Sequence, residues 1–142
     1  MTFEQIATTL TLIGVGTVIP TIVSSVMNSR KAKSASKQET KEKRYKAIIL
    51  LSYAFLNYDK EKSTLIIQRP DIESKEELYN VLHVEWMNMS LYASDKVILR
   101  MRNFLKESVQ INYNSLILEM RKDLYSVKTK LGPDDLLLTK DC

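Results

Sequence analysis

Hydrophobic and polar positions divide the chain into an uncharged N-terminal run and a longer part with helical periodicity. The run extends from Gln5 to Ser29, twenty-five residues without a charged side chain. An α-helix needs about 20 mainly apolar residues to cross the hydrocarbon core of a bilayer. We therefore expect a transmembrane anchor over residues 1–29.

The remaining pattern predicts helices. A segment over about Glu42–Tyr58 is apolar almost all round, which is typical of a helix inside a bundle or against another subunit. Ser74 and Glu77 have the spacing of a capping box and begin the next helix. Two more helices are expected, one from Ser94 and one over about Val109–Tyr125.

Candidate core residues follow the three-and-four spacing of these helices. They are Leu78, Tyr79, Leu82, Trp86, Met89, Val97, Ile98, Met101, Phe104, Leu105, Tyr113, Leu116, Ile117, Met120 and Leu124. Asp59–Pro70 is expected to be a connection with a short extended piece at Leu65–Ile67, and a short turn is expected after Gly132. The predicted fold class is all-α: an N-terminal transmembrane helix followed by a cytosolic bundle of about four helices, over residues 47–142.

Basic residues after the uncharged run predict its orientation. Residues 30–46 carry eight basic and two acidic side chains, whereas only Glu4 precedes the run. Basic residues beside a membrane segment stay on the cytoplasmic face. We expect a bacterial inner-membrane protein with its N-terminus outside and its C-terminal domain in the cytoplasm. A cleaved signal peptide is the alternative, but it requires a basic start, and residues 1–5 contain no Lys or Arg.

The anchor has two unlike faces on a helical wheel. Small and hydroxylated residues gather on one side, as Ala7, Thr11, Gly14, Thr21, Ser25 and Asn28. Such residues let membrane helices approach closely and hydrogen-bond to one another. The seam predicts either helix self-association or, in an oligomer, the lining of a water-filled path. A lone spanning helix whose hydroxyls bond to their own backbone is the alternative.

Residues 30–46 form either a basic juxtamembrane helix or a flexible linker. As a helix they would place one stripe of cations beside anionic lipid headgroups, made of Arg30, Lys33, Lys37, Lys41 and Arg44. This segment has a local charge of +6 within a formal total of +4, so the rest of the chain sums to −2. The basic run lacks interleaved aromatic residues, which argues against nucleic acid as the partner. Arg100, Arg102 and Arg121 remain candidates for RNA or phosphate contact.

Candidate chemistry is sparse. The chain has one His and one Cys, His83 and Cys142, whereas metal and nucleophile sites draw on several such residues. His83 precedes Glu85 by two residues, but the Pro-Cys-x-x-Cys partner of zinc deaminases does not occur. No glycine-rich phosphate loop is present. We therefore expect no enzymatic activity, no metal and no cofactor.

Three short segments carry a resemblance to small bacterial single-pass membrane proteins: Leu91–Ile98, Met120–Leu124 and Thr129–Asp135. The layout is also similar to the membrane accessory protein of RNA-targeting CRISPR systems. That resemblance implies an oligomeric pore with a cytosolic domain related to HEPN folds, acting in phage defence. HEPN ribonucleases have Arg followed by four to six residues and His, whereas thirteen residues separate Arg69 from His83. This departure favours a non-enzymatic role.

The sequence thus predicts a homo-oligomeric inner-membrane protein that perturbs or permeabilises the membrane, as an antiphage defence accessory or effector. A membrane-tethered adaptor that recruits a protein partner is the first alternative. A membrane-bound RNA-binding protein is the second.

Overall fold

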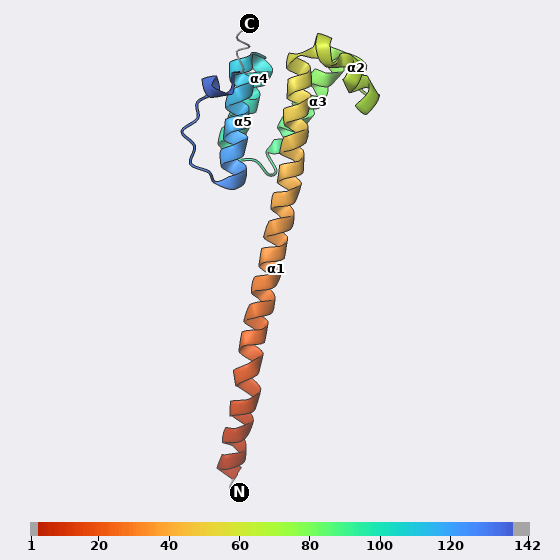
Figure 1. Cartoon of the computed structure of the whole chain (residues 1–142). Helices are drawn as coiled ribbons and strands as arrows, with labels where there is room; N and C mark the ends of the chain where they lie inside the picture. Colours follow the sequence, from red (N-terminus) through yellow and green to blue (C-terminus); the bar gives the residue numbers. More distant parts are fainter. Residues whose placement is uncertain (1–2, 138–142) are drawn as a thin grey trace. The chain divides into compact units, whose positions relative to one another are not determined.

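The computed structural model describes the backbone of residues 3–137 and the side chains of residues 24–137. Within that range the elements are α1 (Phe3–Leu56), α2 (Tyr58–Gln68), α3 (Lys75–Met89), α4 (Asp95–Lys106), α5 (Gln110–Tyr125) and the 3₁₀ helix η1 (Pro133–Leu136) (Figure 1). No strand occurs over residues 3–137, so the all-α prediction is confirmed.

The chain divides into two compact units, Met1–Glu39 and Thr40–Cys142. In the first unit, the side chains from Ser24 to Glu39 are exposed. Residues 30–46 are helical throughout, as part of α1.

Within the part of the chain that the structure describes, no helical segment meets the length and hydropathy that a membrane span requires. The predicted anchor falls mostly on residues 1–23, whose side chains lie outside the described residues.

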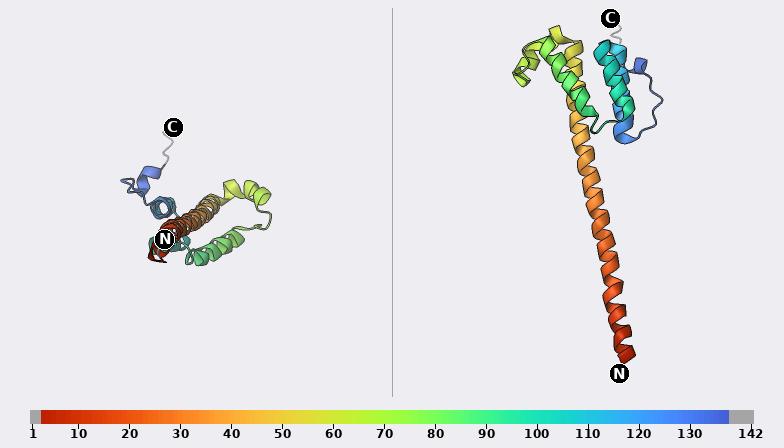
Figure 2. Two further views of the ribbon diagram at one scale, coloured as in Figure 1. Left: turned by 90° about the horizontal axis from the view of Figure 1, so that it is seen from below. Right: turned by 180° about the vertical axis from the view of Figure 1, so that it is seen from behind.

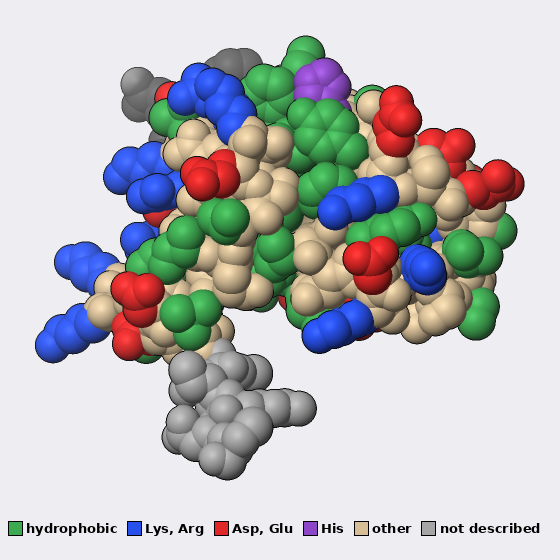
Figure 3. Space-filling model, turned by 90° about the horizontal axis from the view of Figure 1, so that it is seen from above, with side chains coloured by type: hydrophobic (Ala, Val, Ile, Leu, Met, Phe, Trp, Pro, Cys, Tyr) green, Lys and Arg blue, Asp and Glu red, His purple; other side chains and the backbone are tan. Residues whose placement is uncertain are grey.

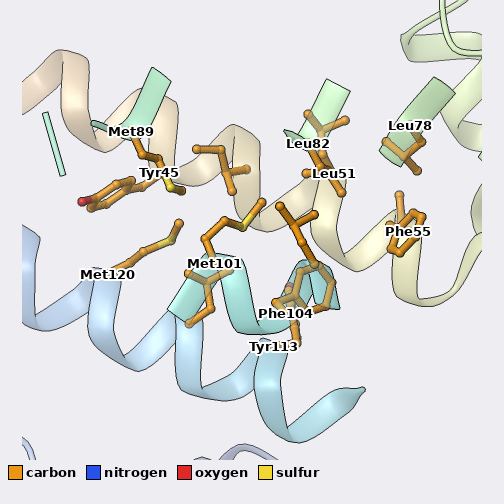
Figure 4. Close-up of a cluster of buried hydrophobic side chains, with 14 of the residues drawn as sticks. Tyr45, Leu51, Phe55, Leu78, Leu82, Met89, Met101, Phe104, Tyr113 and Met120 are labelled. Carbon is orange, nitrogen blue, oxygen red and sulfur yellow. The ribbon is translucent and has the colours of Figure 1, made fainter. Parts of the chain in front are cut away.

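The second unit is built around one apolar core, to which α1, α3, α4 and α5 all contribute (Figure 4). Its buried members include Tyr45, Ile48, Leu51, Phe55, Leu78, Leu82, Met89, Val97, Met101, Phe104, Tyr113, Leu116 and Met120. α4 packs against both α3 and α5, and η1 lies against α5 (Figure 2).

Local signals fix the helix ends. Ser74 accepts a hydrogen bond from the Glu77 amide, and the Glu77 carboxylate accepts one from the Ser74 amide, so the predicted capping box is present at α3. α5 ends at Tyr125, and the next residue, Ser126, adopts the left-handed conformation with a φ of 52°. The predicted turn after Gly132 is η1, in which the Asp135 side chain accepts from the Gly132 amide.

The prediction for Asp59–Pro70 was wrong, because most of this segment is helix α2. The β-branched residues Ile66 and Ile67 suggested an extended piece at Leu65–Ile67. Packing overrides that preference, since Leu65 is buried against the core. Asp59 and Glu61 also lie in the first turn, where negative charge favours a helix.

Most of the predicted core residues of α3, α4 and α5 are buried, but Tyr79 is exposed. Its ring lies at the edge of the core, 5.9 Å from the Phe55 ring. Trp86, Ile98, Ile117 and Leu124 are partly buried.

Candidate functional site

A hollow with a volume of about 370 Å³ lies between the end of α1 and α2 in the second unit. We call it the α1–α2 groove. Its lining is Ala47, Leu50, Leu51, Tyr53, Ala54, Glu61, Thr64, Leu65, Gln68 and Arg69. Most of the α1 side chains in this lining are apolar, whereas α2 adds a polar rim.

A tight reversal after α1 creates the groove. The Asn57 amide and its side-chain nitrogen both donate to the Tyr53 carbonyl, at 3.0 and 3.1 Å, which closes the last turn of α1. The chain then turns back, and Leu65 and Ile72 hold α2 and its following loop on the core. The small side chains of Ala47 and Ala54 leave the space between the two helices unfilled.

Leu50 and Tyr53 are exposed side chains in the lining of the groove. Their exposed fractions are 67% and 44%, although both belong to a helix that the sequence predicts to be buried all round. Fully burying a leucine side chain is worth about 1.5–3 kcal/mol. Covering the exposed Leu50 would therefore contribute free energy that the uncovered domain does not have.

Apart from the groove, a polar cluster around Asp123 connects α1, α4 and α5. Its carboxylate accepts hydrogen bonds from the Tyr45 hydroxyl and, at 3.4 Å, from the Ser94 amide. Lys41 Nζ lies 2.7 Å from Asp123 Oδ2. Burial by itself raises the pKa of Asp123, but the hydrogen bonds from Lys41 and Tyr45 outweigh it and hold the pKa below its usual value.

The polar cluster around Asp123 also changes the pKa of Tyr45. Burial and the neighbouring Asp123 carboxylate raise the pKa of Tyr45, so its hydroxyl stays protonated and donates the hydrogen bond. Ser94 and Asp123 belong to two of the segments that carry the family resemblance, and the structure brings these segments together. The sequence analysis did not identify Asp123, because its partners Tyr45 and Ser94 lie 78 and 29 residues away.

The predicted headgroup residues fall into two groups. Arg30, Lys33 and Lys37 are exposed on α1. Lys41 pairs with Asp123, and Arg44 lies 3.7 Å from the Glu85 carboxylate and 5.5 Å from the centre of the Tyr92 ring. The last two cations of the stripe thus contact acidic residues of the second unit, and Arg44 stays exposed.

Of the predicted anchor seam, Ser25 and Asn28 are exposed on α1. The side chains of Ala7, Thr11, Gly14 and Thr21 lie outside the described residues. The seam stays a prediction for all six residues.

The predicted RNA-contact residues do not gather into one strip. Arg100 and Arg102 are both exposed on α4, but residues two apart on a helix point to different sides. Arg121 is on α5, where it lines a smaller hollow of about 170 Å³ beside Glu42, Tyr45 and Tyr125.

His83 is exposed on α3, with ring centres 6.5 Å from Tyr79 and 5.6 Å from Trp86. Among the described residues, no three His, Cys, Asp or Glu side chains are close enough to hold a metal ion. Comparison of the chain with protein-family models, with curated proteins and with solved structures found no match.

Proposed function

We propose that this chain is a membrane-anchored protein that self-associates and permeabilises the membrane, as a defence accessory or effector. The uncharged run Gln5–Ser29 would cross the bilayer, and the helical domain would lie in the cytoplasm. Copies would meet along the small-residue seam of the anchor and through their helical domains.

The α1–α2 groove is the observation that carries the proposal. It joins an exposed Leu50 to a hollow whose lining on α1 is mainly apolar. Apolar surface of this kind drives association in water, because burying it removes it from the solvent. The same helix, α1, contains the predicted anchor, so one element supplies both proposed contacts.

Exposed cations on α1 support the membrane position. Arg30, Lys33 and Lys37 follow the uncharged run directly. Each basic residue close to an anionic bilayer surface contributes about 1 kcal/mol of attraction. They would hold the cytoplasmic end of the anchor at the headgroups.

Mass measurement of the full chain in detergent tests the self-association. We expect an assembly of several copies, because both the seam and the groove would be occupied. A strict monomer at micromolar concentration would refute the proposal.

Ion leak from liposomes tests the permeabilisation. Thr21→Leu with Ser25→Leu should abolish the leak while the protein stays inserted, because the polar seam would no longer line a path. Ile19→Leu with Val23→Leu is the matched control on the opposite face, and it should leave the leak unchanged. Equal conductance in both double variants would show that the seam lines no path.

A membrane-tethered adaptor is the second candidate. The polar rim that Glu61, Thr64 and Gln68 give the groove also suits an amphipathic helix from a different protein. An identified stoichiometric partner that protects Leu50, together with liposomes that stay tight, would favour this function over permeabilisation.

A further inference from the structure

α3 has a second apolar face, directed away from the core. Val84, Met87 and Leu91 are spaced by three and four residues, so they lie on one side of the helix. Ser90 keeps helical backbone angles, which extends the row to Leu91 beyond the last residue of α3. The exposed fractions of the three side chains are 57%, 59% and 85%. We call this row the α3 ridge.

The ridge lies opposite the residues by which α3 joins the core. Leu78, Leu82 and Met89 of the same helix are completely buried (Figure 4). Covering the apolar side chains of this second face with a partner is favourable, because it removes them from water. Hydrophobic side chains also reach the surface of the domain between charged ones on the face seen in Figure 3.

Charge indicates what kind of partner fits the ridge. From Leu78 to Ser94 the only Asp, Glu, Lys or Arg is Glu85, and its carboxylate lies near Arg44. Depletion of charge around exposed Met and aliphatic residues is typical of the core of a protein interface. An RNA strand or an anionic headgroup would instead require basic side chains.

The α1 wall of the α1–α2 groove has the matching properties, whereas the charged members of the lining, Glu61 and Arg69, come from α2 and the residue after it. Its α1 wall belongs to the segment from Ala47 to Asn57, which contains no charged residue. Ala47 and Ala54 leave a hollow, whereas the ridge presents larger side chains that project. The groove and the ridge share no residue, so one copy of the chain can use both surfaces at the same time.

We propose that the α3 ridge of one copy occupies the α1–α2 groove of the next. This contact rests on the proposed self-association and names the surfaces that it uses. Because each copy contributes two different surfaces, the interface is heterologous. Repetition of such a contact builds a closed ring, or an open filament where the rotation does not close.

Cysteine cross-linking between two differently tagged full chains tests the contact. Cys142→Ser removes the only native thiol. One chain then carries Leu50→Cys in the groove and the other Met87→Cys on the ridge. Both positions are exposed, so neither change should disturb the fold, which circular dichroism verifies.

We expect the mixed pair to cross-link in detergent with a yield several-fold above that of either chain alone. Ile67→Cys is the matched control, since Ile67 is 82% exposed but belongs to neither surface. Paired with Met87→Cys, it should give only the background yield. Cross-links confined to like pairs, 50 with 50 or 87 with 87, would overturn the proposal in favour of a symmetric contact.

Mass measurement on the same samples separates the two levels of the argument. Oligomers without the 50–87 cross-link would overturn the ridge-in-groove contact and leave self-association standing. Monomers without any cross-link would overturn both.

Discussion

Ser52 is the one completely buried hydroxyl in the described part of α1 without a hydrogen-bond partner. It lies among Ile48, Leu51 and Phe55, on the side of α1 that faces the core. A buried polar group without a partner costs about 1–3 kcal/mol. The sequence gives no sign of this cost, because a lone serine in an apolar helix is unremarkable until the surrounding helices are placed.

Replacing this hydroxyl should stabilise the protein. Ser52→Ala is expected to raise the free energy of unfolding by about 1 kcal/mol, since it removes an unsatisfied group and favours the helix. Urea unfolding of the full chain in detergent, followed by Trp86 fluorescence, measures the effect. Ser115→Ala is the control, because that hydroxyl donates to the Ile111 carbonyl at 2.8 Å. A loss of stability in Ser52→Ala would contradict this account.

Asp123 should make the stability depend on acid pH. Its pKa is lowered in the folded state, so the unfolded chain takes up the proton first as pH falls. The stabilisation is therefore complete above the ordinary aspartate pKa near 3.8 and is lost as pH falls through the lowered value. Asp123→Asn should cost about 2 kcal/mol at pH 7, because Lys41 and Tyr45 lose a charged partner.

Urea unfolding at several pH values tests this expectation. The difference between wild type and Asp123→Asn should shrink between about pH 5 and pH 2. Glu42→Gln is the control, since Glu42 forms an exposed pair with Lys46 and should have a much smaller effect at pH 7. A difference that is independent of pH would mean that the ionised carboxylate does not supply the stability.

Among the elements, those with local signals were predictable. Ser74 and Glu77 mark the start of α3, and the periodicity of Val97, Met101 and Phe104 marks α4, because these patterns depend on residues within one or two turns. α2 was missed, since Ile66 and Ile67 favour extended structure and the burial of Leu65, which stabilises the helix, depends on residues far away in the sequence. The α1 wall of the groove could thus be anticipated from the sequence, whereas its α2 wall could not.

The capping box of α3 should carry measurable stability. Ser74→Ala is expected to cost about 1 kcal/mol, because the Glu77 amide loses its acceptor. Ser94→Ala is a matched control at the start of α4, where the serine side chain makes no capping hydrogen bond. Thermal unfolding by circular dichroism compares the two variants. Equal losses in both would show that the hydrogen bond to Glu77 is not the source.

Charge is distributed unequally along the whole molecule. Residues 30–46 hold a net charge of +6, while the remainder sums to −2. The structure adds that Lys41 pairs with Asp123 and that the exposed Arg44 pairs with Glu85. Arg30, Lys33 and Lys37 are the exposed cations of the stripe that lie nearest to the predicted anchor, and they would set its orientation in a membrane.

The single cysteine reports this orientation directly. Cys142 is the only thiol, and the proposed topology puts it in the cytoplasm. A membrane-impermeant maleimide should label it only after bacterial spheroplasts that express the chain have been lysed. Thr2→Cys combined with Cys142→Ser is the matched control, and it should react in intact spheroplasts, because the N-terminus would lie outside.

Replacing Arg30, Lys33 and Lys37 with Gln should increase labelling of Cys142 in intact spheroplasts, since fewer cations would then hold the C-terminal side of the anchor inside. If Cys142 of the unaltered chain were labelled in intact spheroplasts, its C-terminus would lie outside. That result would contradict the proposed topology and the proposed headgroup contact of Arg30, Lys33 and Lys37.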